Sequence, residues 1–453
     1  MTAGSPARME PALYAAAIVL GAATLASKLL GLVRDRLLAA SFGAGRELDL
    51  YFAAFQLPDA LFSLILLGAA SAAVLPAILE RERAGRGETD RFVSNLLLGV
   101  AVLGSASAVT AIMAAPHVVT LLTPGFSPAE QAEVTRLTRI MAPGAVLLGL
   151  AAVLSAFLQA RGRFLAFALP PVVYNLGIIG GIMLGVPRFG LAGLAAGVLG
   201  GGIMQIAVQL PTLVATGYRF RFVPAGVGAA LGRVAAVSAP RVLATAIGQG
   251  TQLILVALLS LLAAGSISAF RFGLNLAYLP VSLFGVSWAL AAFPSITASA
   301  LAGRGQAFAE TFAVGLRGAL FFALPSAALV LALSHEAVRL VLGAGAFGPA
   351  DAFLVASVLA ALAPAIVSES VLPIVLRAFY ALGHTREPLI GNALSAAATV
   401  AIAVLATRWF PERPVLGIAL AFSAGSALNV FLLWMALGSA ARRALGVVPA
   451  LGG

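Results

Sequence analysis

The chain has 453 residues, of which 61% are hydrophobic and only 10% are charged, and its mean hydropathy is +1.04. Water-soluble proteins average about 25% charged residues, so this composition excludes a soluble globular protein and indicates an integral membrane protein. The net charge of +11 comes almost wholly from arginines in short connections between apolar segments. Such charges orient a membrane protein, and we therefore expect no nucleic-acid partner.

Transmembrane helices are the first elements that the sequence predicts. A helix needs about 20 apolar residues to cross the hydrocarbon core, and counting by this rule gives about twelve helices in an all-α integral membrane protein. The first apolar segment is longer than the roughly 7–15 residues of a signal-peptide core, so we expect it to be retained. The predicted helices are 11–33, 50–79, 92–115, 136–160, 164–186, 190–215, 240–263, 268–299, 311–333, 352–381, 388–407 and 414–438.

The arginines predict the orientation of these helices. Eleven arginines lie in the connections that follow even-numbered helices and two in the C-terminal tail, whereas the opposite connections contain mainly five, so the positive-inside rule places both termini in the cytoplasm. Arg34 and Arg36 lie at the outer end of the first helix and oppose the rule, which suggests that another role keeps them there.

The sequence also repeats itself. Leu57-Pro58 recurs as Leu279-Pro280 at an offset of 222 residues, and F-S-P-A-E at 126–130 recurs as F-G-P-A-D at 347–351 at an offset of 221. An even number of helices per repeat predicts two six-helix lobes of the same orientation, related by a pseudo-two-fold axis along the membrane normal. We expect an N-lobe at 1–222, a linker at 223–239, and a C-lobe with a short cytoplasmic tail at 240–453.

Charge is concentrated between Ser27 and Tyr51, in the first membrane-length segment. A charge at such depth is costly, so it is by default a candidate functional group. Lys28 and Arg34 could present positive charge to an anionic ligand in a cavity, with Asp35 positioning one of them. Snorkelling of the two cations toward the outer headgroups is the competing interpretation, and Asp49 could instead cap the second helix.

The second half offers fewer candidates. Arg271 and Asn275 are four residues apart and therefore neighbours on one helix face. Glu369 and Arg377 lie in the tenth predicted helix and could line a cavity. Three amides, Asn175, Gln249 and Gln252, are expected to form hydrogen bonds between helices rather than to bind a ligand.

The residue types of most catalytic sites are scarce. Cysteine is absent, which excludes disulfides and thiolate metal sites. His117, His335 and His384 are far apart in the sequence, so we expect neither a histidine metal site nor a hydrolytic triad. Lys28 is the only lysine and lies in S-K-L-L, so no phosphate-binding GxxxxGK loop can form. We predict no enzymatic activity and no cofactor, with a coupling ion or the membrane potential left open as the energy source.

Five motifs resemble the MviN/MurJ family, and the similarity extends along nearly the whole chain. They are S-K-L-L-G-L-V-R-D at 27–35, F-G-A-G followed by Asp49, A-V-L-P at 73–76, T-P-G-F at 123–126 and R-A-F-Y-A-L-G at 377–383. Members of this family are lipid II flippases of bacterial peptidoglycan synthesis, within the larger group of multidrug and oligosaccharidyl-lipid exporters.

The resemblance implies a two-lobe fold whose central cation-lined cavity opens alternately to each side of the membrane. It implies transfer of lipid II, an undecaprenyl-diphosphate glycolipid, from the inner to the outer leaflet of the bacterial cytoplasmic (inner) membrane. The implied partners are this glycolipid, membrane lipids and cell-wall synthesis proteins. Arg34, Asp35 and Asp49 match the functional pattern of the family, and Lys28 stands where the family usually has arginine.

The chain departs from the family pattern at several positions. Phe62 and Asn275 replace arginines, and Leu67 and Tyr278 replace acidic residues. Arg271 lies one turn before Asn275 and could supply the missing cation. Many members also have fourteen helices, two more than we count here. Two alternatives therefore stay open: an exporter of another lipid-linked oligosaccharide or small amphiphilic cation, and a membrane scaffold of cell-wall synthesis that transports nothing.

Overall fold

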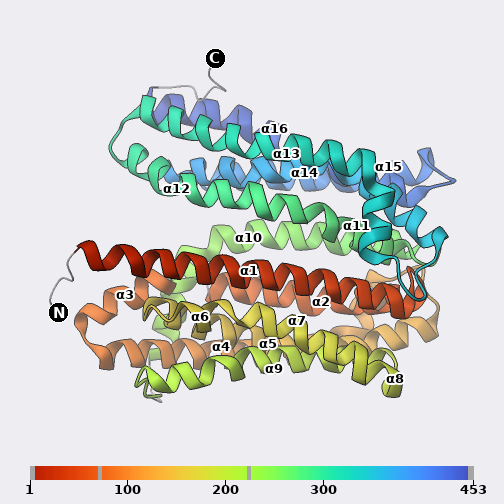
Figure 1. Cartoon of the computed structure of the whole chain (residues 1–453), viewed down its shortest axis with the longest axis horizontal. Coiled ribbons are helices and arrows are strands. Elements are labelled where there is room, and N and C mark those ends of the chain that lie inside the picture. Colours follow the sequence, from red (N-terminus) through yellow and green to blue (C-terminus); the bar gives the residue numbers. More distant parts are fainter. Residues whose placement is uncertain (1–5, 70–73, 222–225, 447–453) are drawn as a thin grey trace. The chain divides into compact units, whose positions relative to one another are not determined.

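The computed structural model describes residues 6–69, 74–221 and 226–446 (Figure 1). All regular structure within these ranges is helical, which confirms the predicted all-α class. The contacts divide the chain into two compact units. Unit 1 comprises Met1–Ser41, Leu50–Leu121 and Ser127–Val242, and unit 2 comprises Phe42–Asp49, Leu122–Phe126 and Leu243–Gly453.

Unit 1 is built around the packing of α9 against α5 and α7, which run side by side in Figure 1. Its core contains Leu96, Phe157 and Leu158, all fully buried. Its helices are α1 (Pro6–Phe42), α2 (Arg46–Ala69), α3 (Val74–Ala84), α4 (Arg86–Leu122), α5 (Pro128–Ala160), α6 (Phe164–Ala168), α7 (Pro170–Gly180), a π-helical turn (Gly181–Gly185), α8 (Val186–Phe189), α9 (Leu191–Ala215) and the first part of α10 (Val227–Ser260).

Unit 2 is built around α14, which packs against α13 and α16. Phe308, Phe312 and Phe379 form the fully buried aromatic part of its core. Besides the first turn of α2, up to Asp49, its helices are the rest of α10, α11 (Ser266–Pro280), a π-helical turn (Val281–Gly285), α12 (Val286–Leu301), α13 (Gly305–Leu342), α14 (Pro349–Ala381), α15 (Arg386–Trp409) and α16 (Pro414–Leu445).

Ten helical stretches in the described ranges are long and apolar enough to cross a membrane, and α1 and α2 lie where the first two spans are predicted. Several boundaries differ from the prediction. α4 extends well beyond 92–115, α10 begins at Val227 within the predicted linker, and the predicted helix 50–79 corresponds to α2 and α3. The 20-residue rule counts only the apolar part of a helix, whereas polar residues at its ends continue the helix beyond the hydrocarbon.

The sequence repeat recurs in the local backbone. Gly43 and Gly265, 222 residues apart, both have positive φ, at 63° and 90°. α5 and α14 each begin with proline, and each has an acidic residue three positions after the helix cap. Glu130 accepts a hydrogen bond from the Ser127 N–H at 2.7 Å, and Asp351 accepts one from the Gly348 N–H at 3.0 Å. An acceptor here satisfies a backbone donor that the helix leaves unpaired.

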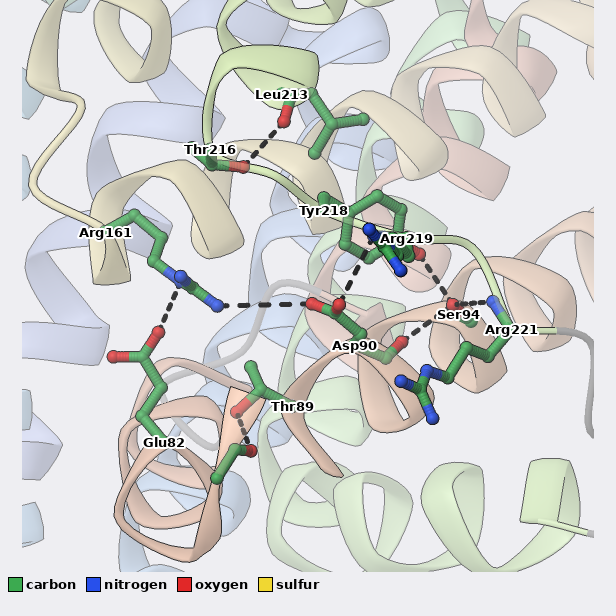
Figure 2. Close-up of polar contacts among 11 residues, drawn as sticks. Glu82, Thr89, Asp90, Ser94, Arg161, Leu213, Thr216, Tyr218, Arg219 and Arg221 are labelled. Atoms are coloured by element: carbon green, nitrogen blue, oxygen red, sulfur yellow. Dashed lines mark hydrogen bonds and ion pairs between the residues drawn. The ribbon is translucent and has the colours of Figure 1, made fainter. Parts of the chain in front are cut away.

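A polar network holds the segment after α9 against α4 and the end of α5 (Figure 2). Asp90 accepts a hydrogen bond from the Arg219 N–H at 3.3 Å and lies 4.0 Å from the Arg161 guanidinium, which also forms an ion pair with Glu82. The Arg161 guanidinium also lies over the Phe157 ring. The network therefore connects four separate parts of unit 1: α3, α4, the end of α5 and the segment after α9.

Ser94 is the centre of this network. Its hydroxyl donates to the Asp90 carbonyl at 2.7 Å, lies 2.7 Å from the Tyr218 hydroxyl and accepts from the Arg221 N–H at 3.0 Å (Figure 2). Burial raises the pKa of Tyr218, the hydrogen bond to Ser94 lowers it, and the charge of Asp90 raises it further. Tyr218 therefore keeps its proton and donates to Ser94, which uses both its donor and its acceptor capacity.

Asp49 caps a helix other than its own. α11 begins after Gly265, which has no side chain to accept from the first turn. Asp49 accepts instead, from the N–H groups of Gly265 and Ser268 at 2.7 Å each and from the Ser268 hydroxyl at 2.8 Å. The suggestion that Asp49 caps the second helix is therefore wrong, because α2 begins at Arg46 and the carboxylate is used by α11.

We expect Asp49→Ala to lower the thermal stability of the purified protein. The change leaves two buried N–H groups without an acceptor, which costs about 1–3 kcal/mol. The measurement is thermal unfolding in detergent, with Glu47→Ala as the control because Glu47 is exposed in the same helical turn. Equal melting temperatures for the two variants would contradict the capping role.

Ser94→Ala is expected to destabilise the protein more than Tyr218→Phe does. The serine variant removes one hydrogen bond and leaves two donors without their acceptor, at about 1–3 kcal/mol, whereas the tyrosine variant removes one bond, at about 0.5–1.5 kcal/mol. Thermal unfolding of both variants and of Arg219→Ala checks this order. Because Arg219 contributes its backbone N–H, its truncation should have the smallest effect, and a reversed order would refute this description of the network.

Candidate functional site

The charged stretch of α1 forms an ion pair inside unit 1. Arg34 donates to Asp35 Oδ1 from Nε at 3.0 Å and from Nη2 at 2.8 Å, and its Nη1 donates to Asn175 Oδ1 at 3.2 Å. Asp35 is 5% exposed. An unpaired carboxylate at such a position would be costly, so the neighbouring guanidinium stabilises it.

Asn175 connects this ion pair to α7. Its Nδ2 donates to the Pro171 carbonyl at 3.0 Å and to the Ser27 carbonyl at 3.3 Å, while its oxygen accepts from Arg34. The predicted hydrogen bond between helices is therefore present. These contacts fix the direction of the Arg34 side chain, so the cation is held before any ligand arrives.

Arg34 lines a pocket of about 380 Å³ in unit 1, which we call the Arg34 pocket. Tyr174, Phe55 and Phe62 supply aromatic walls, and Asp59 supplies a second charged group. Other lining residues come from α5 and α9: Met141, Gly144, Ala145, Leu148, Val198 and Gln205. A mostly apolar pocket with a few fixed polar groups is typical of a site for an amphipathic ligand, and the guanidinium fits an anionic group on it.

The other predicted site residues lie elsewhere. Lys28 is half-buried on α1 and forms no ion pair with a described residue. Arg271 and Asn275 are both half-buried on α11 in unit 2, one turn apart. Asp49 is in the cap of α11. The structure therefore brings Arg34 and Asp35 into direct contact, and it places Asp49, Arg271 and Asn275 in the other unit.

Sequence reasoning missed two contributors to the Arg34 pocket. Tyr174 lies one position before Asn175, and Asp59 follows Pro58. Both could have been found only by knowing that α2 and α7 approach α1. Among the residues that the structure describes, no group of three histidine, cysteine or acidic side chains could hold a metal ion.

The chain is similar to known proteins over nearly its whole length. The family model described as lipid II flippase MurJ matches residues 38–448. A probable lipid II flippase MurJ from Rhizobium tropici is 29% identical over 442 residues, covering 93% of this chain and 80% of the relative. The lipid II flippase MurJ of Burkholderia cenocepacia is 26% identical over 444 residues, covering 94% and 84%.

Solved structures have the same fold. The lipid II flippase MurJ in an inward closed conformation matches with a TM-score of 0.79 and 23% identity, covering 92% of this chain and 87% of that chain. An inward-facing multidrug resistance MATE family transporter of the MOP superfamily matches with a TM-score of 0.71 and 16% identity, covering 91% and 95%. The family resemblance of the motifs is thereby confirmed. The chain is a multi-pass membrane protein, not an enzyme, and it belongs to the MurJ family of lipid II flippases.

Proposed function

We propose that this protein moves lipid II, or a closely similar polyprenyl-diphosphate glycolipid, from the inner to the outer leaflet of the bacterial cytoplasmic membrane. The observation that supports this most directly is the Arg34 pocket, in which a guanidinium is held in place inside a membrane-spanning unit. A substrate with an anionic diphosphate and a long apolar tail needs such a combination. Family membership is consistent with this substrate class.

The physical role of the cations is to replace water around the diphosphate. Phosphate oxygens lose hydration when they leave the headgroup region, and in a medium of low dielectric constant each cation compensates more than it would in water. Arginine does this with a fork that binds two oxygens, whereas Lys28 provides a point charge. We propose Arg34 and Lys28 as the phosphate-binding groups of unit 1, and Arg271 with Asn275 as those of unit 2.

We propose alternating access without ATP hydrolysis as the transport mode. Proteins of this fold are known in inward-facing and outward-facing conformations. Both termini would lie in the cytoplasm under the orientation that the arginines predict. The membrane potential or an ion gradient would then supply the energy.

The function is tested by rescue of bacteria depleted of their own lipid II flippase. Expression of this protein should restore growth, and a leaflet-specific assay should show labelled lipid II reaching the outer leaflet. Growth without transfer to the outer leaflet would indicate a scaffold. Failure of both in cells that contain the protein in the membrane would reject lipid II as the substrate.

Arg34→Gln should abolish rescue, because a charge-assisted hydrogen bond to the diphosphate is worth about 1.5–3 kcal/mol, roughly 10–100-fold in affinity. The same change also leaves Asp35 without its ion pair, so a second variant is needed. Arg34→Gln/Asp35→Asn removes both charges and restores neutrality. If Arg34 binds substrate, the double variant also fails to transport.

Recovery of transport in the double variant would show that Arg34 serves only to neutralise Asp35. Arg188→Gln is the matched control, because Arg188 is exposed on α8 and donates only to the Leu184 carbonyl of its own helix. That variant should support growth as the unchanged protein does. Membrane levels of all three variants are compared by immunoblot.

Arg271→Gln is expected to weaken binding of a polyprenyl diphosphate to the purified protein by about tenfold, the loss of one charge-assisted contact. Native mass spectrometry with the lipid in detergent measures this. Arg317→Gln is the control, since Arg317 is an exposed arginine on α13 of the same unit. Equal affinity of the two variants would remove Arg271 as a substitute for the arginine that the family has at Asn275.

A further inference from the structure

Unit 2 contains a pocket of about 330 Å³ that the proposed function does not use. Five helices contribute to it: α10, α11, α14, α15 and α16. We call it the Glu369 pocket, after the only carboxylate among its lining residues. No arginine, lysine or histidine is among the described residues that line it. Its charge is therefore opposite to that of the guanidinium in the Arg34 pocket.

Glu369 is oriented by two hydroxyl groups. The Tyr278 hydroxyl donates to Oε2 at 2.9 Å, and the Ser426 hydroxyl donates to Oε1 at 2.6 Å. Each carboxylate oxygen thus accepts a hydrogen bond, which is the pattern that suits the ionised form. The two hydroxyls leave the negative charge of the carboxylate uncompensated. A positively charged ligand would offset the cost of burying that charge inside a membrane-spanning unit.

Three further hydroxyls of the pocket have also used their protons. Thr251, Ser395 and Thr399 each donate to a backbone carbonyl of their own helix, at 2.9, 3.0 and 2.7 Å. A hydroxyl that donates to its own helix can offer only lone pairs to a ligand. Five of the six hydroxyls among its lining residues therefore donate within the protein, and the carboxylate disfavours an anionic ligand such as phosphate and favours one with N–H donors.

Two amide oxygens of the pocket lack a hydrogen-bond partner among the described residues. Gln252 Oε1 and Asn429 Oδ1 are buried and have no hydrogen bond, and Asn429 is 7% exposed. Gln252 Oε1 accepts no hydrogen bond from a described residue, so the hydrogen bond between helices predicted for Gln252 is not present at this oxygen. A buried amide without a partner costs about 1–3 kcal/mol, and a ligand that donates to it would remove this cost.

Size and shape favour an organic ligand over a bare metal ion. A metal ion needs several ligands within roughly 2.6 Å, whereas 330 Å³ corresponds to about ten water molecules at ~30 Å³ each. Tyr278 and Phe422 also line the pocket. Aromatic faces attract organic cations, and they accommodate the apolar body that carries an ammonium group.

We infer that the Glu369 pocket binds an organic ammonium ion, with Glu369 as the counter-ion and with Gln252 and Asn429 as acceptors of its N–H groups. This site is independent of the diphosphate-binding groups proposed above, since it needs neither Arg34 nor Arg271. It gives unit 2 a ligand class of its own, namely small amphiphilic amines.

The test compares three probes that share one ring and differ in charge: benzylammonium, benzyl alcohol and benzoate. Isothermal titration calorimetry on the full chain in detergent should show benzylammonium binding about tenfold or more tighter than benzyl alcohol, as expected for one charge-assisted contact, and no binding of benzoate. Equal affinities for benzylammonium and benzyl alcohol would overturn the inference. Binding of sodium with no binding of benzylammonium would also overturn it.

Variants locate the binding. Glu369→Gln keeps the shape of the side chain and should weaken benzylammonium binding about tenfold, whereas Glu310→Gln, on the exposed face of α13, should not change it. Asn429→Leu breaks no hydrogen bond that the structure contains, so it should fold even if Glu369→Gln does not, and it should weaken binding several-fold. Unchanged binding in both Glu369→Gln and Asn429→Leu would place the ligand elsewhere and reject the site. Arg34→Gln should bind benzylammonium with unchanged affinity even though it should not transport. Amine binding and the proposed flippase activity are therefore tested separately.

Discussion

The cost of an unpaired polar group in hydrocarbon shapes this protein more than any other constraint. Water cannot satisfy a donor or acceptor within the membrane, so each must find a partner in the chain. Pro116 in α4 is one example. It has no N–H to donate to the Ile112 carbonyl one turn earlier, so this carbonyl accepts instead from Arg139 of α5 at 3.1 Å. Asp49 at the start of α11 and Asp35 beside Arg34 follow the same rule.

This constraint explains why the general architecture could be predicted from the sequence. Apolar segments must be helical and must cross the membrane, so composition alone predicts an all-α protein and approximate helix positions. The repeat of proline and acidic residues at an offset of 221–222 residues is visible as well, because helix caps have local sequence signatures. α10 begins at Val227, within the predicted linker, because residues 227–239 are mostly apolar although arginines and glycines indicated a connection.

Partners between helices could not be predicted in the same way. Asp49 carries the residue type of a helix cap, but nothing nearby in the sequence indicates that it caps a helix 216 residues later. Asn175 and Gln252 are both intramembrane amides with the same expected role, yet Asn175 bonds to α1, whereas the side-chain oxygen of Gln252 has no hydrogen bond with a described residue. Charge within a membrane-length segment and motif resemblance both identified Arg34 as a candidate, whereas the walls of its pocket depend on which helices pack together.

The directions in which hydroxyl groups donate determine which ligand charge a pocket prefers, and the amino-acid composition does not reveal them. By residue type, the Glu369 pocket is simply polar, with serine, threonine, tyrosine and amide side chains beside its carboxylate. Its preference for a cation arises because Tyr278 and Ser426 donate to one carboxylate and because Thr251 and Thr399 donate to their own helices. Ligands of opposite charge can therefore bind to the two units without competing for the same groups. Any coupling between them must then come from a conformational change that both ligands favour or oppose, because coupling between separate sites requires different affinities for two states.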